Sequence, residues 1–452
     1  MTKQWDFLQP KPYSGLGEGT IAFLAAVIWF AAILVRHRLP DAGDWSLGES
    51  LFEAFSFVAF AAVPIFGLAT HLGERLVERI LLPKQGLVFQ IVLCIALALQ
   101  IGLGKALHLG PRHFSWIEQF DTLIVSGQFW LNVALFLGGV FVALRIPFVV
   151  RELRQQPQPR LRWQLYGLLL LNTLYLSLHR TGTPWEGFAV SAVYGAICLG
   201  LTWPHRRSVN ALPKNRLVLS DFWLMVLCAA ILYWFSIPSF SFGVFIGVNL
   251  FVLVVVYGSG LGREHFGYSF AMQRQDWPVL AALLLSVIFA LVPLAIVSGF
   301  VQPALDQNQF GPLRSLAYFV LFAFRVGIFE EVFFRSGVMV LLRDCLGRGS
   351  TRWAIGGGQK LRAKSSPQTI LWLSAIGCSV LFGLSHIGNE SGTNPLALWQ
   401  YRGLYIVLAT SASLFYSIAF AKTNRLAVPI LVHGFVDTIA VVLLGGSLAV
   451  PF

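Results

Sequence analysis

Residues 314–342 read RSLAYFVLFAFRVGIFEEVFFRSGVMVLL, an apolar run long enough to cross a lipid bilayer as a helix. After the opening arginine, four charged side chains lie inside this run: Arg325, Glu330, Glu331 and Arg335. A charge within a membrane is costly, so such residues are expected to pair with one another or to carry function. The stretch therefore predicts a transmembrane fold with a polar site inside it.

The rest of the chain has the same apolar character. Of its 452 residues, 56% are hydrophobic and only 12% are charged, and the mean hydropathy is +0.70. A soluble domain carries about a quarter charged residues and a disordered chain has few apolar ones, so both classes are excluded. The sequence predicts an all-α, polytopic transmembrane helix bundle. About thirteen segments qualify as spans, near residues 20–35, 51–72, 87–103, 127–145, 163–178, 187–203, 221–236, 242–260, 278–299, 314–342, 368–387, 397–420 and 424–447.

The distribution of charge predicts the orientation of the bundle. The chain has 33 basic and 21 acidic residues, and the basic ones cluster in alternate connections, including 151–162, 206–216 and 343–364. Because lysine and arginine gather in cytoplasmic loops, we expect the N-terminus in the cytoplasm. We expect a multi-pass integral protein of a prokaryotic plasma (inner) membrane, with the lipid bilayer as a partner. Nucleic acid is excluded, because the aromatic residues lie within or beside the apolar runs.

Titratable side chains gather in the spans after residue 320. Glu331 and Arg335 are four residues apart on one helical face, with the acid first, which favours an ion pair. Successive helical residues point about 100° apart, so Glu330 is expected to face elsewhere, toward a cavity where Gly327 leaves room. A purely structural lock between helices explains the Glu331–Arg335 pair well but explains Glu330 poorly. A carboxylate in such a place suits general acid or base chemistry.

Two further motifs lie on later spans. Phe382 and His386 are four residues apart near the end of one span, and His433 and Asp437 are four apart on the last. A single histidine near a span end is more often satisfied by water or backbone than functional. Two histidines with several carboxylates on neighbouring spans are hard to explain as separate accidents.

The ordered motifs Glu330-Glu331-x-x-x-Arg335, Phe382-x-x-x-His386 and His433-x-x-x-Asp437 resemble a known family. It is the CAAX-protease and bacteriocin-processing family of intramembrane proteases, also called CPBP or Abi, which includes the type II CAAX prenyl endopeptidases. The resemblance covers about residues 220–452 and implies a protease core there. Residues 1–219, with about six spans, then form an N-terminal transmembrane region of unknown role.

The resemblance also implies roles for the motif residues. Glu330 and His386 would activate a water for attack on a peptide carbonyl, and His433 and Asp437 would stabilise the oxyanion or complete the site. Arg335 would hold Glu331 in place, and Phe382 would contact the substrate. Asp437 stands where prenyl-processing members commonly have asparagine, whose amide can donate to an oxyanion whereas an ionised carboxylate cannot.

The residues leave two versions of this chemistry open. Two histidines and a carboxylate match a catalytic zinc site, so Glu330, His386 and His433 are candidate ligands for Zn²⁺ or another divalent metal. The alternative is metal-free general-base catalysis by Glu330. The expected substrate is a membrane-embedded or lipidated protein or peptide, and the sequence does not fix an oligomeric state.

Two other functions compete with an endopeptidase. Carboxylates and histidines within a membrane also build the proton relays of secondary transporters. A catalytically silent membrane scaffold could instead recruit partners through residues 343–367, whose glycine and serine content predicts a flexible cytoplasmic loop. The three ordered motifs favour the endopeptidase.

Overall fold

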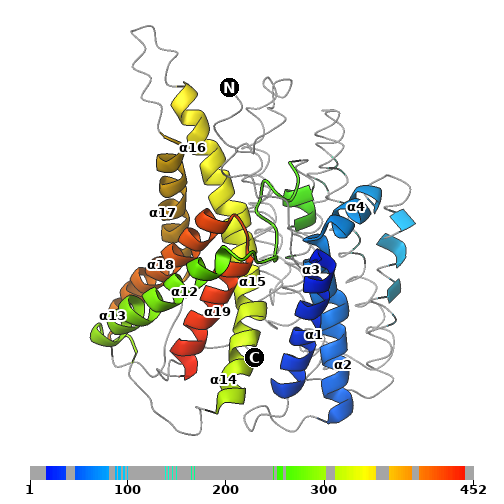
Figure 1. The fold of residues 1–452 in the computed structure, drawn as a ribbon, viewed down its shortest axis with the longest axis horizontal. Coiled ribbons are helices and arrows are strands. Elements are labelled where there is room, and N and C mark those ends of the chain that lie inside the picture. The colour runs from blue at the N-terminus through cyan, green and yellow to red at the C-terminus, as the bar shows by residue number, and fades with distance from the viewer. Residues whose placement is uncertain are drawn as a thin grey trace. The chain divides into compact units, whose positions relative to one another are not determined.

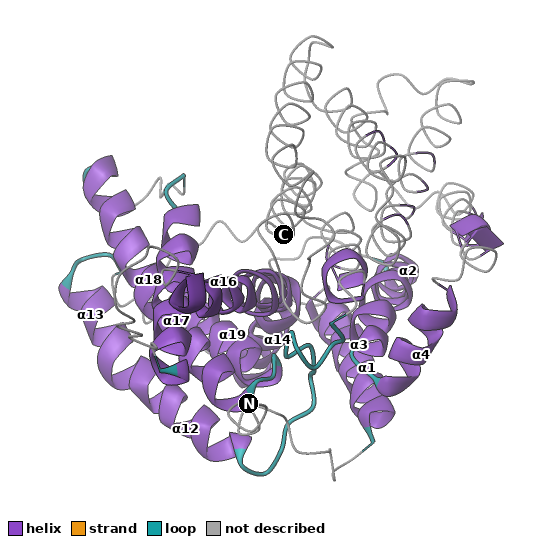
Figure 2. Ribbon diagram, turned by 90° about the horizontal axis from the view of Figure 1, so that it is seen from above, coloured by secondary structure: helices purple, strands orange, loops and turns teal. Residues whose placement is uncertain are grey.

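The computed structural model describes residues 17–36, 46–80, 252–257, 261–301, 311–352, 366–388 and 396–442, with isolated positions between 87 and 248. Regular structure within these ranges is helical throughout, and no strand occurs among them (Figure 2). The predicted all-α class therefore holds for the described residues. The chain divides into two compact units, one made of Met1–Trp45 with Arg263–Phe452 and the other of Ser46–Gly262. The domain boundary predicted between residues 219 and 220 lies outside the described residues and stays a prediction.

The second unit, Ser46–Gly262, is described mainly at its start. Ser46 and Glu49 form a capping box in which each side chain accepts from the other residue's backbone N–H, which fixes the first turn. A π-helical segment follows just before Pro64, whose ring cannot fit the tighter α-helical turn preceding it. The described elements are α2 (Leu47–Phe57), η3 (Val58–Ala62), α3 (Val63–Leu68), α4 (His71–Ile80) and η8 (Val252–Tyr257).

The first unit holds all the predicted site residues. Its elements are α1 (Glu18–Arg36), α12 (Asp276–Ser286), η9 (Val287–Leu291), α13 (Val292–Val297), α14 (Pro312–Phe322), η11 (Ala323–Gly327), α15 (Ile328–Glu331), η12 (Val332–Met339), α16 (Val340–Arg352), α17 (Pro367–Ser385), α18 (Leu398–Thr423) and α19 (Ala427–Val442). The segments from α14 to α16 follow one another as a single long rod (Figure 1). α17 packs on α16 and α18, and α19 packs on α18, α14 and η11.

Four helices among the described residues are long and apolar enough to cross a membrane: Glu18–Val35, Asp276–Val297, Pro367–Ser385 and Leu398–Thr423. They match the spans predicted near 20–35, 278–299, 368–387 and 397–420, and the shorter apolar helix Ala427–Val442 lies within the span predicted at 424–447. The total of thirteen is not confirmed. The six spans predicted between 87 and 260 lie largely outside the described residues.

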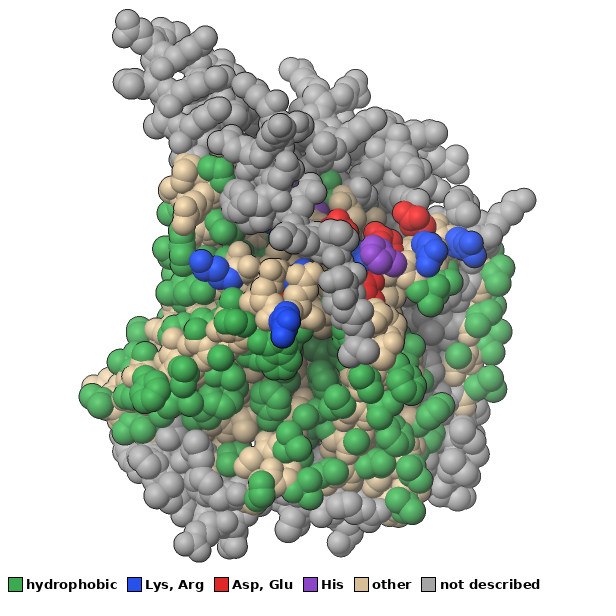
Figure 3. Space-filling view, viewed as in Figure 1, with side chains coloured by type: hydrophobic (Ala, Val, Ile, Leu, Met, Phe, Trp, Pro, Cys, Tyr) green, Lys and Arg blue, Asp and Glu red, His purple; other side chains and the backbone are tan. Residues whose placement is uncertain are grey.

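The surface of α12 and α13 has the apolar character that a lipid-facing surface requires. No charged residue occurs between Trp277 and Val297, and large side chains such as Phe289 are strongly exposed. Hydrophobic side chains accordingly gather over these two helices (Figure 3). A water-facing surface rarely carries such a continuous apolar patch, whereas a bilayer requires one.

The structure corrects the first part of the prediction for residues 343–367, whereas residues 353–365 lie outside the described residues. Residues 343–352 are not a flexible loop, because α16 continues to Arg352. The prediction placed the end of the helix at the first basic residue, but Arg343 is held against the protein by a hydrogen bond to the His265 carbonyl oxygen at 3.2 Å. Next to it, Asp344 lies 2.9 Å from Nε2 of His265, so the polar residues pack and the helix goes on.

The entry to α19 is fixed by a tight turn. Asn424 ends α18 with a φ of 50°, in the left-handed region that asparagine tolerates, and the chain turns at once into α19. Arg425 in this turn forms a buried ion pair with Asp276 at the start of α12, at 3.0 Å. The turn thereby fixes where α19 begins and the position of its side chains along the helix axis.

Two glycines set how closely the helices approach. A Cβ on Gly434 of α19 would lie 2.7 Å from the Cβ of Ala323, so α19 and η11 pack backbone against backbone. A Cβ on Gly327 would meet the Ile430 carbonyl oxygen at 3.4 Å and the Cβ of His433 at 3.6 Å. This close contact brings the acidic segment of the long rod directly against the histidine of α19.

The first helix of the chain also belongs to this unit. α1 packs on α14, and the rings of Trp29 and Phe324 stack at 5.4 Å. Trp29 is fully buried, so this contact is part of the interior. The unit is therefore assembled from two stretches of chain that are far apart in the sequence.

Candidate active site

The predicted site residues come from three helical segments that pack together. Glu330 and Glu331 end α15, Arg335 lies in η12, His386 caps α17 and His433 lies within α19. The rod is π-helical on both sides of α15, a form that recurs at functional sites because it redirects side chains. Residues 332–339 contain no proline or other signal that predicts the π-turns of η12.

A buried ion pair lies at the base of the site. Nε of Arg335 is 2.9 Å from Oε2 of Glu331, and both side chains are 0% exposed. The predicted Glu331–Arg335 pair is thus confirmed. Arg335 also donates from Nη2 to Ser413 Oγ at 2.9 Å and from Nη1 to Cys378 Sγ at 3.1 Å. Contacts from α17 and α18 therefore hold the guanidinium in one position.

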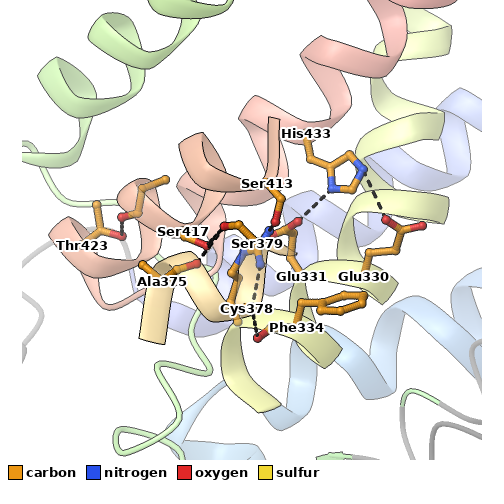
Figure 4. Close-up of polar contacts among 12 residues, drawn as sticks. Glu330, Glu331, Phe334, Ala375, Cys378, Ser379, Ser413, Ser417, Thr423 and His433 are labelled. Atoms are coloured by element: carbon orange, nitrogen blue, oxygen red, sulfur yellow. Dashed lines mark hydrogen bonds and ion pairs between the residues drawn. The ribbon is translucent and has the colours of Figure 1, made fainter. Parts of the chain in front are cut away.

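His433 is contacted by carboxylates at both ring nitrogens. Its Nδ1 lies 2.9 Å from Oε1 of Glu331, and its Nε2 lies 3.7 Å from Oε2 of Glu330 and 3.5 Å from Oδ2 of Asp437. Figure 4 shows the imidazole between the two glutamates. We expected Glu330 and Glu331 to face different points, yet both contact this residue. The two side chains do leave the helix in different directions, but the His433 ring is wide enough that Nδ1 meets Glu331 and Nε2 meets Glu330.

Exposure divides this cluster into a closed and an open side. The side chains of Glu331 and Arg335 are fully buried, whereas those of Glu330 and Asp437 are 20% and 18% exposed. Oε2 of Glu330 is itself buried and has no hydrogen-bond partner among the described residues. A buried carboxylate oxygen normally accepts a hydrogen bond. Glu330 is therefore placed to accept one from a bound molecule.

His386 lies one ring away from this cluster. Its Nδ1 is 2.9 Å from the carbonyl oxygen of Phe382, which can only accept, so the proton of the neutral ring is on Nδ1. Nε2 then presents a lone pair. The Phe382 ring lies 4.8 Å from the ring of His386 and 5.9 Å from that of His433. The structure thus brings five predicted residues into direct contact and joins His386 to them through Phe382.

The predicted metal ligands do not form a metal-binding group in the part of the chain that the structure describes. No three His, Cys, Asp or Glu side chains there are arranged to hold an ion, and this includes the set Glu330, His386 and His433. A divalent metal at this site stays a prediction.

The sequence predicts a span at 397–420 but no site residue within it. In the structure, Ser413 of α18 contacts Arg335, and Tyr416 of α18 stacks on His433 with ring centroids 4.5 Å apart. The Arg335 guanidinium also lies over the Tyr416 ring, at 5.7 Å. A signal was present, because Ser413 and Tyr416 are three residues apart on one helical face in a span of low charge.

A known family model matches the part of the chain that holds these residues. Residues 312–439 match the family model described as type II CAAX prenyl endopeptidase Rce1-like. All the predicted site residues lie within that segment, which is shorter than the resemblance expected over 220–452. Neither the curated proteins nor the solved structures contain a match to the chain. The apolar helices and the family match together support an integral membrane protein, and the match supports a peptidase.

Proposed function

We propose, from the match of residues 312–439 to type II CAAX prenyl endopeptidases, that this chain is an intramembrane endopeptidase. It hydrolyses a peptide bond in a membrane-associated protein or peptide. The observation that carries the proposal is the arrangement of Glu330 and Asp437 around Nε2 of His433, with the buried Glu331–Arg335 pair behind them.

Glu330 is the general base of the proposed reaction. Its buried Oε2, which accepts no hydrogen bond from the described residues, accepts a proton from a water, whose oxygen forms a bond to the peptide carbonyl carbon. Nε2 of His386 accepts a hydrogen bond from the same water and orients it. Glu331 cannot take this role, because its two oxygens already contact Arg335 and His433.

His433 stabilises the charge that develops on the carbonyl oxygen. Its Nδ1–H donates to Glu331, and in the proposed reaction its Nε2, which faces the carboxylates of Glu330 and Asp437, also carries a proton. Nε2–H then donates to the oxyanion, a contribution worth about 100- to 1000-fold in rate at comparable sites. The carbon–nitrogen bond breaks as Glu330 returns its proton to the leaving amine.

The surroundings of the site suit an apolar substrate. Phe382 is 3% exposed and packs against both imidazoles, so the inner wall of the site is apolar, and the outer faces of α12 and α17 are apolar as well. A membrane-embedded segment or a lipidated peptide, such as the prenylated ends named in the family description, reaches such a site from the bilayer. A cytoplasmic N-terminus and a prokaryotic plasma membrane stay predictions.

The test compares the ends of membrane and secreted proteins in cells that carry the wild type or Glu330→Gln. The matched control is Glu264→Gln, which makes the same change at an exposed residue outside the cluster. We expect some peptide ends to appear with the wild type and the control but not with Glu330→Gln, when all three proteins are present in the membrane in equal amounts. Identical ends in all three strains would overturn the proposal.

A further inference from the structure

Each of the two imidazoles at the site stacks on a tyrosine. The ring of His433 lies 4.5 Å from that of Tyr416 with 13° between their planes, and the ring of His386 lies 5.3 Å from that of Tyr405 with 20° between them. Both tyrosines belong to α18, the helix that carries none of the motifs found in the sequence. Because the two contacts are of the same kind and come from one helix, we expect the two tyrosines to have the same role.

The geometry of α18 makes both contacts possible at once. Tyr405 and Tyr416 are eleven residues apart, which is about three helical turns, so their side chains share one face. α18 packs along α17, which carries His386, and against α19, which carries His433. A single straight helix thus lies behind both histidines and fixes the distance between their supports.

The stacks restrain a motion that the hydrogen bonds leave open. His433 is held at Nδ1 by Glu331, and His386 at Nδ1 by the Phe382 carbonyl oxygen. A ring held at one nitrogen can still rotate about that hydrogen bond, which would swing Nε2 out of the site. A parallel aromatic ring against its face blocks this rotation.

A second ring completes the support of His433. Phe382 meets the imidazole at 73°, so its contact is to the edge, whereas Tyr416 covers the face. Tyr416 is 1% exposed and is also covered by the Arg335 guanidinium at 5.7 Å, so its own ring is fixed. The support of the imidazole is therefore connected to the buried ion pair through Arg335.

We propose that Tyr416 and Tyr405 are positioning residues that set the planes of the His433 and His386 imidazoles, a role that rests on the proposed endopeptidase function. The role requires an aromatic ring and no hydroxyl group. Phenylalanine should therefore replace either tyrosine, whereas leucine, of similar apolar character but without a flat face, should not.

The experiment measures the wild-type-dependent peptide ends in cells, normalised to the amount of protein in the membrane, for Tyr416→Phe, Tyr416→Leu, Tyr405→Phe and Tyr405→Leu. The leucine variants are expected to lower cleavage about 3- to 10-fold, and the phenylalanine variants to stay within about twofold of wild type. Tyr318→Leu is the control, because Tyr318 is a buried tyrosine of α14 that stacks on Phe322. It should cleave as the wild type does.

Each outcome bears on one proposal or both. Leucine variants that cleave normally would overturn the positioning role, and so would phenylalanine variants as poor as leucine, since the hydroxyl would then be what matters. If Tyr416→Leu does not accumulate, Tyr405→Leu decides, because Tyr405 is only half-buried and its loss leaves a smaller cavity. Glu330→Gln run alongside separates the two ideas: unchanged ends there would overturn the endopeptidase and the positioning role together.

Discussion

Replacing Arg335 by methionine should be among the most destabilising single changes in the described part of the chain. The side chain is 0% exposed and forms the ion pair with Glu331 at 2.9 Å and donates to Ser413 and Cys378. Methionine fills much of the same volume but leaves the Glu331 carboxylate buried without its cation. Breaking a buried pair in this way costs about 3–5 kcal/mol, so we expect a loss of roughly 4 kcal/mol in the free energy of unfolding.

The double variant Glu331→Gln/Arg335→Met tests whether charge is the cause. Because it removes both ions, the penalty for a lone buried carboxylate disappears, and we expect it to recover about 2 kcal/mol relative to Arg335→Met. The assay is denaturant-induced unfolding of the full chain in mixed micelles, followed by circular dichroism. Arg274→Met is the control, because Arg274 is exposed and its loss should change stability by less than about 0.5 kcal/mol.

Either of two results would contradict a stabilising Glu331–Arg335 pair. A cost below about 1 kcal/mol for Arg335→Met would mean that the pair is solvated or dispensable. Strict additivity of the two single changes in the double variant would mean that Glu331 and Arg335 do not act as a pair.

Three further predictions concern packing and the site. Gly383→Ala should destabilise the protein by about 1–3 kcal/mol, because its Cβ would lie 2.6 Å from the Ile406 carbonyl oxygen. Gly403→Ala on α18, where a Cβ would meet nothing within 4 Å, should be neutral or stabilising. Equal melting temperatures for the two variants would contradict this packing. Asp276→Asn should cost about 3 kcal/mol by leaving Arg425 buried without its carboxylate, and an unchanged thermal midpoint would show that the pair is not needed. Asp437→Asn should retain cleavage within about tenfold, because the new amide can itself donate to the oxyanion and so replace the support that the Asp437 carboxylate gives to His433. Asp437→Ala supplies neither and should lose roughly 100-fold. The same peptide-end measurement checks both variants, and equal losses would exclude the amide's role.

Local patterns in the sequence predicted much of this site. The four-residue spacings of Glu331 and Arg335 and of His433 and Asp437 give the contacts found, because residues four apart share a helical face and need no knowledge of the rest of the fold. The start of α17 also follows from local signals, since Ser366 caps its first turn and Pro367 opens it.

Contacts between distant segments could not be predicted in the same way. That both glutamates reach His433 depends on the close approach of α19 to the rod at Gly327, which no spacing within either helix encodes. The contribution of α18 was missed for a related reason. Tyr405 and Tyr416 look like ordinary residues of an apolar span until the neighbouring helices place imidazoles against them.

The stacking of Trp29 on Phe324 has a consequence for how the protein is made. Some three hundred residues separate the two rings, and at about 5–20 residues per second the ribosome needs roughly 15–60 seconds to deliver the second after the first. During that interval α1 has no α14 to pack on, and a fully buried tryptophan of the finished protein must be sheltered by lipid or by the insertion machinery. Truncated chains that end before α14 should therefore leave α1 without its packing partner and be degraded by quality-control proteases. The packing of the first helix is thus one of the last steps of assembly.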